Sequence, residues 1–265
     1  MSIKTKYGQL ALIAGGSEGI GAAFAHYLAK EGLNLVLVAR GIEKLERVAC
    51  EIRKKYPVEV TCIPCDLSRR DAIDQIKSQL EGKKIDVLVY NAALSFIGPF
   101  EENTMEHHNQ MAQANMITSM NMVQVFGSEM LQNKKGAVII MASLAGFQGS
   151  GFLANYAATK AFNRVLAVSL WYEWKDRGVA VMACCAGATA TPNFIKTKPE
   201  KTSFFAPKVQ TPEAVVNECF NKLGKTPSMI TGTGNKVASF IMQRLMPRKL
   251  AIKIMGDTTR QMYRL

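Results

Sequence analysis

The feature that most constrains the fold is a series of short apolar runs, each followed by a longer stretch with helical spacing. The runs cover residues 10–14, 35–39, 58–63, 85–90, 137–142 and 179–184. Their continuous apolar character is typical of strands buried on both faces of a parallel sheet. The amphipathic stretches between them cover residues 20–31, 42–55, 69–80, 104–132 and 155–176. This alternation predicts the α/β class, a doubly wound parallel sheet of about seven strands with helices on both faces.

The chain is expected to form a single domain over residues 1–265, because no proline- or glycine-rich linker and no internal repeat divides it. A helix over 211–223 is predicted from the capping sequence "TPEAVV" at its start and Gly224 at its end. Residues 190–210, rich in Lys, Pro and Thr, are expected to form a mobile substrate lid. Residues 236–265 form a basic amphipathic C-terminal extension.

The chain is basic, with a net charge of +12 and a pI of about 9.5, which favours an anionic partner such as nucleic acid, an acidic membrane or a phosphorylated cofactor. Residues 236–265 hold seven Lys or Arg and one Asp, so about half of the excess lies there. No nucleic-acid recognition motif accompanies the charge, and no nucleic-acid partner is expected.

Targeting and metal signals are weak. The apolar run near the N-terminus is too short for a signal peptide, and no apolar run approaches the roughly 18 residues of a membrane span, so a soluble cytoplasmic protein is expected. The six cysteines include one CIPC without a second CxxC, and the three histidines form no ligand pattern. No metal site is therefore expected.

The first predicted strand runs into "AGGSEGIG" and then into a helix. Glycines here allow a tight turn and a close approach of the backbone to a pyrophosphate, and the helix start offers free N–H groups. The spacing is G-x-x-x-G-x-G, and glycines also occur in ordinary turns after strands. Its position favours a dinucleotide site, and the candidate contacts are Gly15, Ser17, Glu18, Gly19, Ile20 and Gly21.

The second predicted strand ends at Arg40, where the choice between the two nicotinamide dinucleotides is made. An acidic residue at this position binds the ribose hydroxyls of NAD, whereas a basic residue pairs with the additional phosphate of NADP. Arg40 therefore predicts NADP(H), with Ser17 as a second ligand of that phosphate. The alternative is a solvated arginine at the end of a strand.

Tyr156 and Lys160 lie one helical turn apart in "YAATK" and so share a helix face. Hydride transfer to a ketone requires a proton donor for the developing alkoxide, and a tyrosine can supply it. Its free pKa is about 10, and a nearby ammonium would stabilise the phenolate. The alternative is an exposed Tyr–Lys pair without a catalytic role.

Together these residues resemble the short-chain dehydrogenase/reductase family, which has a Rossmann fold, over essentially the whole chain. "AGGSEGIG" is similar to the TGxxxGIG loop of the family, "YNAA" to NNAG and "YAATK" to YxxxK. "CDL", "QANM" and "MASLAG" match further family segments in the same order. The positions that the resemblance adds to the site are Asp66, Leu67, Asn91, Asn115, Ser143, Gly187, Thr189 and Thr191.

The resemblance implies a catalytic role for four residues. Tyr156 would be the general acid/base, and Lys160 would lower its pKa and hold the nicotinamide ribose. Ser143 would polarise the carbonyl, and Asn115 would position a water in a proton relay to Lys160. Asp66 and Leu67 would contact the adenine side of the cofactor, Asn91 the cofactor, and Gly187, Thr189 and Thr191 the nicotinamide.

Three alanines depart from the family pattern: Ala14 replaces a threonine, Ala93 a glycine and Ala186 a proline. The first removes a hydroxyl that commonly ties the glycine loop to the fourth strand. No group needed for the chemistry is missing.

The predicted substrate is a hydrophobic ketone or secondary alcohol, because apolar residues flank the expected site. These are Leu94, Phe96, Ile97, Phe147, Phe152, Leu153, Phe194 and Ile195. The N-terminal part and the segment 211–225 resemble bacterial hydroxysteroid dehydrogenases of the 7β type, and the tail resembles long-chain 3-oxoacyl and 17β-hydroxysteroid reductases. A hydroxysteroid or bile acid is the favoured substrate. A long-chain 3-oxoacyl or general carbonyl reductase, and an NADP-sensing regulator, are the alternatives.

The tail alternates apolar and basic residues, and Pro247 interrupts any single helix. It could contact an anionic membrane surface or the carboxylate of a lipid-like substrate, and the alternative is a subunit contact or a solvated helix. Family members are commonly homodimers or homotetramers through the helices around 104–132 and 155–176.

Overall fold

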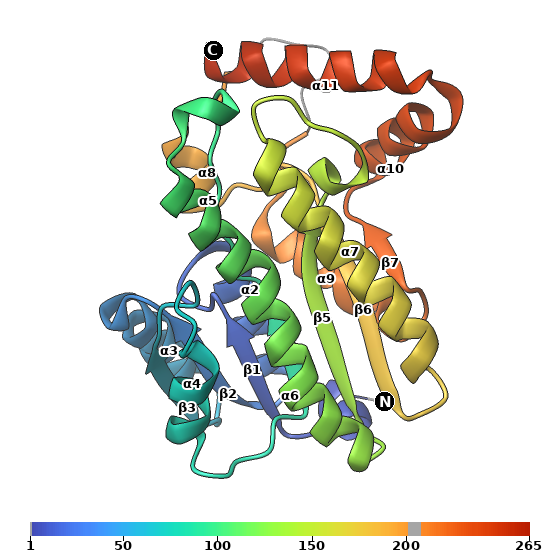
Figure 1. Cartoon of the computed structure of the whole chain (residues 1–265). Coiled ribbons are helices and arrows are strands. Elements are labelled where there is room, and N and C mark those ends of the chain that lie inside the picture. Colours follow the sequence, from blue (N-terminus) through green and yellow to red (C-terminus); the bar gives the residue numbers. More distant parts are fainter. Residues whose placement is uncertain (1, 201–207) are drawn as a thin grey trace.

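Seven parallel strands form one twisted sheet in the computed structural model, which describes residues 2–200 and 208–265 (Figure 1). The order across the sheet is β3-β2-β1-β4-β5-β6-β7. The strands are β1 (Leu10–Ala14), β2 (Asn34–Ala39), β3 (Val60–Pro64), β4 (Val87–Tyr90), β5 (Gly136–Ser143), β6 (Val179–Ala186) and β7 (Ser228–Ile230). The chain starts near the middle of the sheet and winds outward in both directions, which confirms the predicted doubly wound fold.

Helices cover both faces of the sheet. One face carries α2 (Gly19–Lys30), α3 (Ile42–Lys55) and α9 (Pro212–Lys222). The other carries α4 (Ala72–Leu80), α6 (Thr118–Gln132) and α7 (Ala154–Trp174), which lie in front of the sheet in Figure 1. The remaining helices are α1 (Ile3–Tyr7), α5 (Met105–Ala112), α8 (Pro192–Lys196), α10 (Thr233–Phe240) and α11 (Arg248–Tyr263).

The strands are continuously apolar because both faces of the sheet are buried, as expected. Successive residues of β1 point to opposite faces: Ala11 and Ile13 pack into the core beneath α2, whereas Leu12 and Ala14 pack into the core beneath α6. Because each face needs apolar side chains, every position of the strand is apolar.

The predicted strands and the predicted helices between them agree closely with the structure, with two differences. The helix predicted over 104–132 is interrupted, because a π-helical turn, η2 (Gln113–Ile117), separates α5 from α6. The seventh strand, β7, has only three residues and no apolar run of its own. Thr211 caps α9 as predicted, since its hydroxyl accepts from the Ala214 N–H at 3.2 Å.

The C-terminal segment crosses the end of the molecule at the carboxyl edge of the sheet (Figure 1). After α10, a π-helical turn, η4 (Ile241–Leu245), leads to Pro247, where the helix breaks as predicted before α11. Of the segment 190–210, α8 is described, and residues 201–207 lie outside the described residues. Among the described helices none is both long and apolar enough to cross a membrane.

Candidate active site

A cavity of about 810 Å³ lies at the carboxyl edge of the sheet. Its walls come from the loops that follow β1 to β6 and from the C-terminal segment. Parallel sheets bind ligands at this edge, because the connections that leave the inner strands there diverge and open a crevice. All the predicted site residues except Gly21 and Asn115 line this cavity.

The glycine loop takes the backbone shape that its sequence predicts. Gly15 and Gly19 have φ angles of 82° and 57°, which L side chains rarely adopt. A Cβ atom on Gly21 would lie 1.9 Å from the Gly15 carbonyl oxygen, so this glycine allows α2 to begin directly against the loop. Gly21 thus acts in packing and does not line the cavity.

The loop is tied to β4 despite the alanine at position 14. The Ala14 carbonyl accepts from the N–H groups of Asn91 and Ala92 at 3.0 and 2.8 Å. The Asn91 side chain donates to the Gly15 carbonyl at 3.0 Å. These bonds hold the glycine loop where the family pattern commonly uses a threonine hydroxyl.

The end of the cavity beside β2 and α3 carries positive charge. Arg40 is exposed at its edge, one residue beyond β2. Lys44 of α3 also lines the cavity and pairs with Glu18 at 2.7 Å. Lys44, one turn beyond Arg40, is a cavity residue that the sequence motifs did not indicate. Asp66 accepts hydrogen bonds at one oxygen from the Ser68 N–H and hydroxyl, at 3.0 and 2.8 Å, which shapes the loop after β3.

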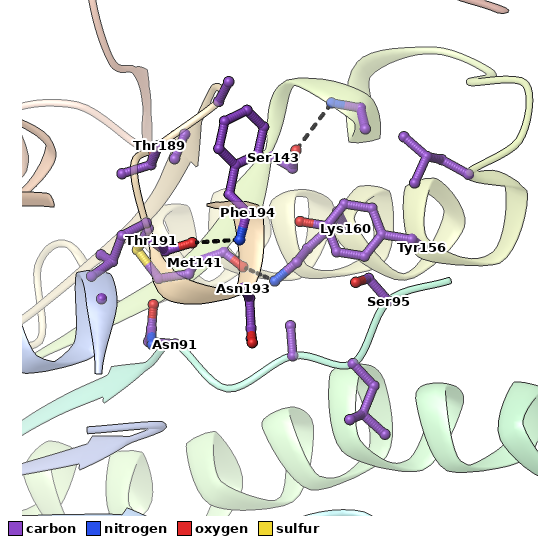
Figure 2. Close-up of a pocket in the computed structure, with 18 of the residues that line it drawn as sticks. Asn91, Ser95, Met141, Ser143, Tyr156, Lys160, Thr189, Thr191, Asn193 and Phe194 are labelled. Atoms are coloured by element: carbon purple, nitrogen blue, oxygen red, sulfur yellow. Dashed lines mark hydrogen bonds between the residues drawn. The ribbon is translucent and has the colours of Figure 1, made fainter. Parts of the chain in front are cut away.

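Tyr156, Lys160 and Ser143 converge on the inner part of the cavity (Figure 2). Tyr156 and Lys160 lie on the first two turns of α7, and the lysine Nζ is 5.7 Å from the tyrosine ring centroid. Lys160 is 3% exposed, and its Nζ donates to the Met141 carbonyl of β5 at 2.9 Å. Ser143 ends β5 and accepts from the Ala145 N–H at 3.2 Å.

Burial sets the protonation of this pair. It lowers the pKa of Lys160 from its ordinary 10.5 to about 8, because the ammonium loses water. It raises the pKa of Tyr156, while the adjacent Ser143 acts in the opposite direction and Tyr263 of α11 adds to the increase. The net shift of the Tyr156 pKa is upward, because desolvation of the phenolate outweighs the hydrogen bond from Ser143.

Asn115 is fully buried inside the π-helical turn and does not line the cavity. Its Oδ1 accepts from the Leu94 N–H at 2.8 Å, and its Nδ2 donates to the Leu94 carbonyl at 2.9 Å and to the Thr159 hydroxyl at 3.0 Å. The Tyr90 hydroxyl donates to the carbonyl of Ala114 in the same turn. The Asn115 side chain therefore joins the loop after β4 to α7 at Thr159, the residue before Lys160.

Fewer of the predicted apolar residues line the cavity than expected. Five of the eight predicted residues line the cavity: Leu94, Ile97, Phe147, Leu153 and Phe194. Phe96 instead meets the edge of the His107 ring, Phe152 lies under the Arg260 guanidinium at 5.1 Å, and Ile195 is 61% exposed. Phe96 and Phe152 thus pack against side chains of α5 and α11, and Ile195 on α8 faces solvent.

The C-terminal segment supplies a further wall of the cavity, which the sequence motifs did not indicate. Met242, Met255, Met262 and Tyr263 line the cavity, together with the polar Ser239, Gln243, Thr258 and Thr259. The spacing of Met255 and Met262, two helical turns apart, was the available signal. Ser95 and Asn193 are two further polar lining residues that the motifs did not indicate (Figure 2).

The comparisons with known proteins agree with this geometry. The short chain dehydrogenase family model matches residues 9–202, and the chain belongs to this family of oxidoreductases. It is 33% identical to a 7β-hydroxysteroid dehydrogenase of Mediterraneibacter gnavus, over 90% of this chain and 91% of that one. It is 31% identical to the very-long-chain 3-oxoacyl-CoA reductase of Bos taurus, over 82% of this chain and 69% of that one.

Solved structures give the same result. A structure described for 7β-hydroxysteroid dehydrogenase stereoselectivity superposes with a TM-score of 0.91 at 32% identity, covering 96% of this chain and 99% of the other. A short-chain dehydrogenase from Sphingobium yanoikuyae, in complex with NADPH, gives a TM-score of 0.76 at 27% identity, covering 84% and 87%. The predicted family and fold are confirmed.

Proposed function

We propose that this protein is an NADP(H)-dependent oxidoreductase that interconverts a hydrophobic ketone and its secondary alcohol, with a hydroxysteroid as the favoured substrate. The observation that carries the proposal is the single cavity into which the glycine loop, the Tyr156–Lys160–Ser143 cluster and a largely apolar wall all open. A dinucleotide and an apolar substrate would therefore meet beside the phenol.

The described residues fit NADP(H). The glycine loop is held open by backbone geometry that a Cβ at Gly21 would destroy. Arg40 stands at the cavity edge and makes no ion pair within the described residues, so its guanidinium is free for a phosphate. Lys160 uses one ammonium hydrogen on Met141, which leaves two for ribose hydroxyls. The bound cofactor would supply the hydride.

In the reduction direction, Tyr156 donates the proton to the carbonyl oxygen of the substrate. Its raised pKa keeps the phenol protonated at neutral pH, which suits a proton donor. Ser143 has a hydroxyl beside the phenol, and that hydroxyl donates to the same carbonyl oxygen. Lys160 would hold the ribose and supply the proton that restores the Tyr156 phenol. A water would then reprotonate the lysine, and Asn115 keeps the π-helical turn and the loop after β4 in place for that water.

The substrate class follows from the cavity walls and the relatives. Three methionines and Tyr263 of the C-terminal segment line the cavity together with the Tyr156 phenol, and the hydroxyls of Ser239, Thr258 and Thr259 are available for a second polar group. A rigid, mostly apolar molecule with a few hydroxyls matches such walls. The relatives named for 7β-hydroxysteroid dehydrogenase activity, which this chain covers almost completely, support the same class.

The test is NADPH oxidation against a panel of oxo bile acids, other ketosteroids and a long-chain 3-oxoacyl thioester. We expect turnover of a steroid, and a loss of at least about a hundredfold in kcat for Tyr156→Phe, since general acid catalysis contributes this much. Tyr172→Phe is the matched control, because Tyr172 is 68% exposed on the same helix. Turnover of the thioester alone would indicate a 3-oxoacyl reductase instead. NADPH binding without any turnover would support a regulator and refute the enzyme.

Cofactor choice is tested at Arg40. Arg40→Ala should raise the KM for NADPH at least about tenfold and leave the KM for NADH almost unchanged, because only NADPH carries the phosphate that the guanidinium binds. Arg47→Ala removes an exposed arginine of α3 outside the cavity and should change neither value. Equal losses for both cofactors would show that Arg40 does not distinguish them.

A further inference from the structure

The outward surface of the C-terminal segment combines exposed apolar and basic side chains around the turn at Pro247. Phe240, Ile241, Leu245 and Leu250 are 60%, 40%, 69% and 46% exposed. Arg244, Arg248, Lys249 and Lys253 are exposed between them. We call these eight residues the cap corner. Large exposed apolar side chains interleaved with cations are uncommon on a surface that contacts only water.

One side of the C-terminal segment lines the cavity, and the other side is exposed. On α10 and η4, Ser239 and Met242 point into the cavity, whereas Phe240, Ile241 and Arg244 are exposed on the other side. On α11, Ala251 is buried and Met255 lines the cavity, whereas Lys249 and Lys253 are exposed. The inner side already accounts for the packing of the helices, so the apolar residues of the cap corner are not needed to close the cavity.

The charge of the segment restricts what can cover this corner. Residues 236–265 carry seven Lys or Arg and one Asp, about half of the net charge of +12. Lys253 pairs with Asp257, and no ion pair is present for Arg244, Arg248 or Lys249 within the described ranges 2–200 and 208–265. A second copy docking through the same corner would bring equal positive charges together, which disfavours an isologous contact.

We propose that the cap corner docks on the surface of an anionic lipid bilayer. Its cations would lie among the lipid phosphates, and its apolar side chains would enter the boundary between headgroups and acyl chains. Because the reverse side of the same helices lines the cavity, docking brings the cavity next to the phase in which apolar ketones accumulate. The docking itself does not depend on which reaction the protein performs.

The experiment is flotation of the whole chain with vesicles at about 0.15 M salt, where weak long-range attraction is screened. Vesicles of phosphatidylcholine with about one third phosphatidylglycerol supply the anionic surface, and pure phosphatidylcholine vesicles are the neutral comparison. The charge variant is Arg248→Glu with Lys249→Glu. Its matched control is Lys83→Glu with Lys84→Glu, an adjacent exposed pair before β4 that changes the net charge equally. Phe240→Ser with Leu245→Ser tests the apolar part.

We expect the wild type to float with anionic vesicles and to remain free of neutral ones. The cap-corner charge variant should bind at least about tenfold more weakly, since each basic residue contributes appreciably near an anionic surface. The control pair should bind nearly as the wild type does, and the apolar variant should also lose binding. All variants should retain the wild-type melting temperature.

Three results would overturn the proposal. The first is no flotation of the wild type. The second is an equal loss for the control pair, which would indicate general attraction by the net charge. The third is undiminished vesicle binding of the apolar variant. If the wild type does not float and the apolar variant changes its oligomeric state, the corner is instead a contact between copies.

Discussion

Replacing Lys160 by methionine should stabilise the fold near neutral pH while it abolishes activity. The lysine ammonium is buried against β5, and burial lowers its pKa from 10.5 to about 8. Each pKa unit corresponds to about 1.4 kcal/mol, so keeping the ammonium charged costs the folded state about 3 kcal/mol below pH 8. Methionine has a similar length and no charge, but leaves the Met141 carbonyl without its donor, which costs about 1 kcal/mol. The expected net gain at pH 7 is about 2 kcal/mol.

The pH dependence identifies the cause. The pKa of this group is lower in the folded state than in the unfolded state, so the penalty is complete below about pH 8 and decreases as the pH rises. Above pH 10.5 the lysine is neutral in both states and the penalty is gone. There, Lys160→Met should be about 1 kcal/mol less stable than wild type, since only the lost hydrogen bond remains.

Urea unfolding of wild type and variant at pH 7, 8.5 and 10.5 measures this difference. Titrations of other groups affect both proteins equally and cancel. Lys54→Met, at an exposed position of α3, should differ from wild type by less than about 0.5 kcal/mol at each pH. A stability difference between Lys160→Met and wild type that did not change with pH, or a loss at pH 7, would refute the assigned desolvation.

Two further predictions concern the backbone. Gly21→Ala should destabilise the fold by about 1–3 kcal/mol and weaken NADPH binding, because its Cβ would lie 1.9 Å from the Gly15 carbonyl oxygen. Urea unfolding and fluorescence titration measure the two effects. Gly234→Ala, which has open space around it and lies outside the residues that line the cavity, should leave NADPH binding unchanged. Thr211→Ala should cost about 1 kcal/mol in urea unfolding, because α9 loses the cap on the Ala214 N–H, and unchanged stability would show that water replaces this cap.

The sheet could be predicted because its signal is local. A strand buried on both faces must be apolar at every position, and β1, β2 and β5 therefore appear as continuous runs in the sequence. The helices between them are amphipathic for the same reason. β7 escaped a specific prediction because a three-residue edge strand has too few positions for any period to appear.

Those candidate site residues that lie close together in one short segment could be predicted from the sequence. The glycine loop and the Tyr156–Lys160 pair are each set by a few adjacent residues. The protonation of the pair could not be predicted from the sequence. The pKa of Lys160 depends on burial against β5, which lies about twenty residues earlier in the chain. Asn115 is similar: its motif indicates a site residue, while its hydrogen bonds to Leu94 and Thr159 depend on three segments meeting.

The sequence by itself determined the order of strands and helices, the backbone of the glycine loop and the groups available for chemistry, since these depend on residue type and short spacing. Only the tertiary structure decided which apolar side chains enclose the cavity. Phe96 and Phe152 are as apolar as Leu94 and Phe147, but the packing of α5 and α11 turns them away. It also placed Met255 and Tyr263 opposite Tyr156, about a hundred residues away, because contacts between distant segments follow from the folding of the whole chain.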